Sequence, residues 1–214
     1  ILLVGPDLHQ YSADFATDPK DSAGSDWLRG FLATNGELVD VVSVHRYPFP
    51  ANMADATTSV EDLRANSREW DEIIPHLRTV VSETVGRDLP VAVTEINTHW
   101  SSAVGGEATP DSFYAAIWWA DVLGRLIRQR VEIVAHFTLH SKNSIGGWGL
   151  LGQSEVRPAY HVYQIYQRFG NQLVHASSGD PDLSIYAALT EAGALTLVVI
   201  NMGLEDASHA LHVE

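Results

Sequence analysis

The chain has 214 residues, of which 45% are hydrophobic and 19% are charged, so it is long enough to bury a core of ordinary composition. Its formal net charge of −14, from 13 Lys and Arg against 27 Asp and Glu, argues against a nucleic-acid or anionic-membrane surface, which would need a basic footprint. Cysteine is absent, which excludes disulfides and thiolate chemistry without fixing a compartment, and no apolar run approaches the roughly 20 residues that a membrane helix requires.

The first two thirds of the chain contain four short apolar runs that predict buried strands. These runs are rich in β-branched residues and nearly continuous, as in strands that are covered on both faces, and they lie at residues 1–4, 39–44, 90–94 and 131–137. The first run begins at Ile1, inside the predicted strand, so we expect that further sequence precedes it.

A helical pattern follows each of the four runs. The predicted helices cover residues 27–32, 59–85, 113–130 and 158–169, and Pro75 suggests a break of the second one into two helices. Strand and helix thus alternate four times, which is typical of a parallel sheet with helical crossovers.

After residue 170 the pattern changes to antiparallel β-structure. Residues 183–189 and 194–201 are apolar and are joined by a turn at 190–193, which predicts a hairpin, and residues 207–213 predict one more strand. We therefore expect a small antiparallel β region after the α/β part.

Polar and aromatic side chains gather directly after the predicted strands. His45 and Tyr47 follow the second strand, and Glu95 follows the third. Because the carboxyl ends of parallel strands share one edge of a sheet, or ring the mouth of a closed barrel, such residues favour a site there. A carboxylate such as Glu95 is costly to desolvate unless it is paired, hydrogen-bonded or open to a wet cleft.

Other reactive groups lack a matching motif. The ten histidines form no His-x-His or His-Glu-x-x-His pattern, the glycines near Trp148 match no dinucleotide or phosphate loop, and no Gly-x-Ser-x-Gly turn occurs. No cofactor is therefore expected, and a carboxylate is the best remaining reactive group. For His45, His136 and His140 a structural role as hydrogen-bonded core histidines stays open.

Several segments together resemble a known family. They are Val4-Gly5-Pro6, Asp40-x-x-Ser43-x-His45-x-Tyr47-Pro48, Thr94-Glu95, Gly147-Trp148-Gly149-Leu150 and Arg157-Pro158-Ala159-Tyr160. This set is similar to the second half of the catalytic barrel in clan A glycoside hydrolases, above all the family 39-like β-xylosidase and α-iduronidase group, with arabinofuranosidase-like relatives behind it. The resemblance implies an α/β fold, with strands five to eight of a (β/α)8 TIM barrel in residues 1–170 and part of an antiparallel β-sandwich in residues 171–214.

The same resemblance implies a retaining hydrolase acting on a carbohydrate substrate, with Glu95 as the nucleophile and His45 and Tyr47 beside it. Trp100 and Trp148 offer aromatic faces on which sugars could stack, and Asn97 is a candidate for binding sugar hydroxyls. Neither nucleic acid nor membrane is an expected partner.

The clan's proton donor is the Glu of an Asn-Glu pair after strand four, and these 214 residues contain no such pair. We therefore expect the donor upstream of Ile1 and the chain alone to be inactive. Two alternatives stay open: a non-catalytic carbohydrate-binding barrel relative, and a metal-dependent barrel hydrolase.

Overall fold

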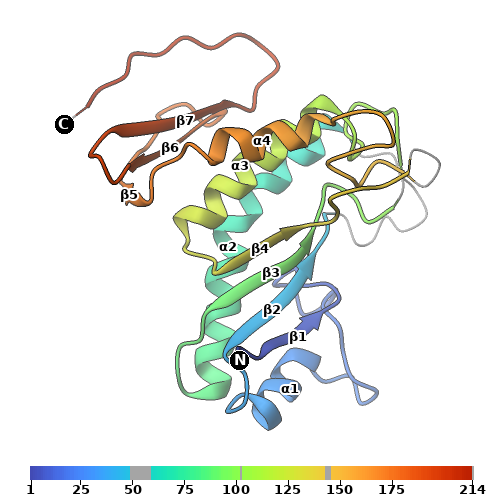
Figure 1. Cartoon of the computed structure of the whole chain (residues 1–214). Coiled ribbons are helices and arrows are strands. Elements are labelled where there is room, and N and C mark those ends of the chain that lie inside the picture. Colours follow the sequence, from blue (N-terminus) through green and yellow to red (C-terminus); the bar gives the residue numbers. More distant parts are fainter. Residues whose placement is uncertain (49–58, 102, 143–145, 214) are drawn as a thin grey trace.

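A four-stranded parallel sheet forms the centre of the computed structural model, which describes residues 1–48, 59–101, 103–142 and 146–213. Its strands, in spatial and chain order, are β1 (Val4–Leu8), β2 (Val41–Arg46), β3 (Val91–Ile96) and β4 (Ile133–His136). Their arrowheads all point toward the same side of the molecule (Figure 1). The predicted parallel sheet is thus confirmed, and its carboxyl ends meet along one edge.

The strand boundaries differ from the predicted ones. Ile1 is fully exposed and β1 begins only at Val4, whereas β2 and β3 continue past their apolar cores. His45 therefore pairs with Glu95 inside the sheet, although both were predicted to follow their strands. The pairing continues because the backbone hydrogen bonds of one strand are satisfied by its neighbour, whatever the polarity of the side chains.

Four helices connect or follow these strands in the described part of the chain. They are α1 (Trp27–Asn35), α2 (Val60–Val85), α3 (Phe113–Arg128) and α4 (Pro158–Tyr166). Three of them begin with a side-chain cap, at Asp26, at Ser112 and, with a complete capping box, at Ser59. The long helices α2 and α3 lie against one face of the sheet (Figure 1). None of the described helices has both the length and the apolar character needed to cross a membrane.

The predicted break at Pro75 is wrong, because α2 runs through this residue as one helix. A proline inside a helix costs about 3 kcal/mol. Here the buried side chains on both sides of it form one continuous stripe, which includes Trp70, Ile74 and Leu77. Packing of this stripe in the core offsets the local cost.

A second, antiparallel sheet follows α4 and consists of β5 (Gln172–Val174), β6 (Leu183–Leu189) and β7 (Leu195–Asn201). The hairpin of β6 and β7 confirms the prediction, whereas residues 207–213 form no strand. The sheet packs on α3, where the hydroxyl of Tyr186 donates to the fully buried carboxylate of Asp121 at 2.6 Å.

Candidate active site

Strands β2 and β3 bring His45 and Glu95 together at the carboxyl edge of the parallel sheet. The register passes from Val44 opposite Val93 to His45 opposite Glu95, so that Thr94 is an extra residue in a β-bulge. His45 Nδ1 lies 2.8 Å from Glu95 Oε2, and the two side chains are 22% and 24% exposed. Because a carboxylate only accepts hydrogen bonds, His45 must carry its proton on Nδ1 in this contact.

Tyr47 adds a second hydrogen bond to Glu95. Burial raises the pKa of Tyr47 far above its ordinary value, and the charge and hydrogen bond of the Glu95 carboxylate raise it further. The phenol therefore stays protonated and donates to Glu95. Gln10 holds the backbone of Tyr47, donating from Nε2 to its carbonyl at 2.9 Å and accepting from its N–H at 3.2 Å.

Asp7 is a further charged group at this edge, and the sequence reasoning did not single it out as a site residue. Its Oδ1 accepts a 2.6 Å hydrogen bond from the hydroxyl of Thr94, and its backbone N–H donates to Ser43 Oγ at 2.9 Å. Burial alone would raise the pKa of Asp7, but the hydrogen bonds of Thr94 and Ser43 and the nearby His45 together lower it below its ordinary value. The one available signal was its place directly after the Gly5-Pro6 strand end.

Asn97 is buried and its amide is occupied by the protein. Its Nδ2 donates to the carbonyls of Phe137 and of Trp148, the latter at 3.1 Å, and its Oδ1 accepts from the Thr98 N–H at 2.7 Å. These hydrogen bonds tie the loop after β3 to the segment that follows β4. Binding of substrate hydroxyls by Asn97 stays a prediction.

The two candidate stacking residues, Trp100 and Trp148, lie on these same loops and are half-buried. Trp148 donates from Nε1 to the carbonyl of His99 at 3.2 Å, and its ring meets the edge of Phe137 at a centroid distance of 5.9 Å. Trp100 stacks on the ring of His99 at 6.0 Å. Stacking of either tryptophan on a sugar stays a prediction.

A metal-dependent hydrolase would need several histidines or carboxylates close together, and the histidines near the strands are dispersed. The partly buried His136 packs its ring against the buried Trp119, whereas His9 is exposed. Within the described ranges, no group of three or more His, Cys, Asp or Glu side chains is placed to hold a metal ion.

Comparison with known proteins finds distant similarity to two proteins that are named as glycan-degrading enzymes. No protein-family profile matches the chain. It is 22% identical over 199 residues to the hyaluronoglucuronidase of Hirudo nipponia, which covers 86% of this chain and 39% of that protein. It is 26% identical over 198 residues to the heparanase of Bos taurus, covering 82% of this chain and 33% of that protein. The chain is thus similar in sequence to proteins that are named as glycoside hydrolases.

Solved structures agree with this relationship at the level of the fold. CelM2, a bifunctional glucanase-xylanase from a metagenome library, superimposes with a TM-score of 0.65 at 24% identity, over 96% of this chain and 44% of that one. The predicted fold class, a TIM-barrel type α/β sheet followed by antiparallel β-structure, is confirmed. The chain spans about two fifths or less of the length of the curated proteins it matches.

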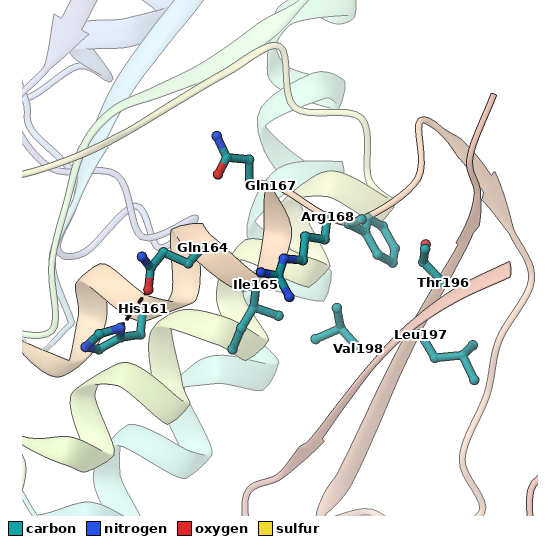
Figure 2. Close-up of a pocket in the computed structure, with 9 residues that line it drawn as sticks. His161, Gln164, Ile165, Gln167, Arg168, Thr196, Leu197 and Val198 are labelled. Carbon is teal, nitrogen blue, oxygen red and sulfur yellow. Dashed lines mark hydrogen bonds between the residues drawn. The ribbon is translucent and has the colours of Figure 1, made fainter. Parts of the chain in front are cut away.

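A cavity of about 630 Å³ lies on another part of the molecule. Figure 2 shows its lining, in which Ile165 of α4 faces Val198 of β7, and His161 lies further along α4 beside Gln164. It opens between α4 and the antiparallel sheet, and neither Glu95 nor any of the sequence-predicted site residues contributes to it.

Proposed function

We propose that this chain supplies the nucleophile of a retaining glycoside hydrolase, and that Glu95 has that role. The observation that supports this most strongly is the carboxylate of Glu95 at the carboxyl end of β3, held by His45 and Tyr47 and still partly open. In such a reaction the carboxylate attacks the anomeric carbon while the leaving oxygen departs, and water then hydrolyses the glycosyl-enzyme.

His45 and Tyr47 orient the nucleophile in this proposal. A nucleophile must be ionised and aimed at the reacting carbon, and two donors on one carboxylate fix the directions of its oxygens. Both donors are themselves held: His45 by the sheet, and Tyr47 by its two hydrogen bonds with Gln10.

The proton donor is proposed to come from outside these 214 residues. A retaining mechanism needs a second carboxyl group about 5 Å from the nucleophile that can give up a proton to the leaving oxygen. In the described part of the chain, Asp7 is a carboxyl group at the same edge of the sheet, but its lowered pKa keeps it ionised at neutral pH, and a general acid needs the opposite shift. We accordingly propose that the chain alone does not turn over unactivated glycosides.

Residues 1–170 would then form the catalytic part, and residues 171–214 an accessory β part. The substrate is proposed to be a carbohydrate, since the similar proteins are named for activity on glycans. The half-buried rings of Trp100 and Trp148 are proposed to pack on its apolar faces.

The test is to trap the glycosyl-enzyme. A 2-deoxy-2-fluoro glycoside with an activated leaving group is incubated with the full-length protein, and the labelled peptide is mapped by mass spectrometry. We expect the label on Glu95, with no label on Glu95→Gln and an unchanged label on Glu132→Gln, which alters an exposed glutamate just before β4. Label on a peptide that lacks Glu95 would refute the assignment. Saturable sugar binding without label would instead indicate the non-catalytic relative.

A further inference from the structure

We propose that Asp7 is a positioning residue for the nucleophile, acting through Thr94 and His45 and not on the sugar itself. This inference rests on the proposed role of Glu95. It concerns how the sheet holds that carboxylate in place.

The backbone is irregular at this edge of the sheet. All three strand pairs lose their regular register at the same level: β1 with β2 around Asp7, β2 with β3 around Thr94, and β3 with β4 between Val93 and Ile96. Asp7 also has a φ of 57°, in the left-handed region, where a residue other than glycine is held at a cost of about 1–3 kcal/mol. Such a conformation persists where surrounding contacts determine it, and bulges of this kind re-aim side chains.

Hydrogen bonds across the strands hold this backbone conformation in place. Asp7 on β1 and Thr94 on β3 are not on neighbouring strands, because β2 lies between them. The 2.6 Å hydrogen bond from Thr94 to Asp7 therefore crosses β2 on one face of the sheet, and Ser43 of β2 joins it through the backbone N–H of Asp7. Three strand ends are thereby tied together.

Thr94 connects these contacts directly to Glu95, the proposed nucleophile. Thr94 is the bulge residue immediately before Glu95, so its side chain sets the bulge from which the Glu95 carboxylate reaches His45. His45 is also close enough to Asp7 to help lower the pKa of that carboxyl. Loss of Asp7 would therefore free the hydroxyl of Thr94 and remove a charge near His45.

A matched control separates positioning from simple strand attachment. Asp40 also ties β1 to β2, accepting from the backbone N–H of Leu3 at 2.8 Å, but at the amino ends of the two strands. Replacing Asp40 by alanine should alter the stability of the protein without altering the orientation of the Glu95 carboxylate.

The experiment measures the first-order rate constant for trapping Glu95 with the 2-fluoro glycoside, whose activated leaving group needs no protonation. Asp7→Ala and Thr94→Val should each slow trapping by about 10- to 100-fold, since small misplacements of a reacting group have effects of this size. The reagent concentration that gives half-saturation should change little. Thr94→Ser should retain most of the rate, because it keeps the hydroxyl, and Asp40→Ala should stay within about twofold of wild type. The double variant of Asp7 and Thr94 should be no slower than the slower single one, because both changes break the same contact.

Folded Asp7→Ala and Thr94→Val proteins that are trapped at the wild-type rate would overturn the inference and leave Glu95 as the nucleophile. If Asp7→Ala unfolds in a thermal melt, Thr94→Val decides the question by itself. Failure to label Glu95 in the wild type would overturn the proposed function and this inference with it.

Discussion

Acidification should destabilise the protein through His136, the last residue of β4. Its ring lies 5.0 Å from that of Trp119, and no partner for its buried Nδ1 is found in the described part of the chain. Burial lowers the pKa of His136 from 6.5 to about 4. The folded protein therefore holds this imidazole neutral over a pH range in which the unfolded chain protonates it.

The sign and size follow from proton linkage. Between pH 6.5 and pH 4 the unfolded state binds more protons at His136, so the free energy of unfolding falls as the pH falls. The stability associated with the neutral imidazole is complete above pH 6.5 and is lost by pH 4. At about 1.4 kcal/mol per pKa unit the full loss is about 3 kcal/mol, and about 2 kcal/mol of it is reached at pH 5.

Urea unfolding at pH 7 and pH 5 measures this loss. Between pH 7 and pH 5 the free energy of unfolding of the wild type should fall by about 2 kcal/mol more than that of His136→Leu, because the other groups titrate equally in both proteins. His161→Leu, which changes an exposed histidine of α4, should behave as wild type. Equal pH dependence in wild type and His136→Leu would refute the reasoning.

Two further substitutions test packing and the site. Gly124→Ala should lower the free energy of unfolding by about 1–3 kcal/mol in urea, because the added Cβ would overlap the ring of Tyr186. Gly30→Ala, which has open space around it, should raise that free energy by up to about 1 kcal/mol. Stabilisation by both substitutions would contradict the packing of β6 on α3. Tyr47→Phe should lower kcat/KM of the full-length protein by about 10- to 100-fold, because a hydrogen bond to a charged group contributes about 1.5–3 kcal/mol. Undiminished activity would exclude a role for the hydrogen bond from Tyr47 to Glu95.

The order of elements could be predicted from the sequence because it depends on local patterns. Continuous apolar runs and helical patterns identify four strand and helix pairs and the later hairpin. The continuity of α2 through Pro75 could not be predicted, because it depends on a core that is assembled from distant segments.

The site could be predicted in part for the same reason. Glu95, His45 and Tyr47 were identifiable because each lies at or just beyond an apolar strand, and parallel strands end on one edge. Asp7 was missed because its contact with Thr94 crosses an intervening strand, 87 residues away in sequence. The contacts of Asn97 could not be predicted, because the carbonyls that accept from its amide belong to Phe137 and Trp148, which are distant from it in sequence.

The most direct test of the central claim is rescue of a Glu95→Ala variant of the full-length protein by azide. The smaller side chain leaves room for an anion on the face of the sugar that the carboxylate would attack. With an activated aryl glycoside, azide should restore turnover and give a glycosyl azide of inverted anomeric configuration. A glycosyl azide of retained configuration, or full activity of Glu95→Ala without azide, would contradict the assignment of Glu95 as the nucleophile.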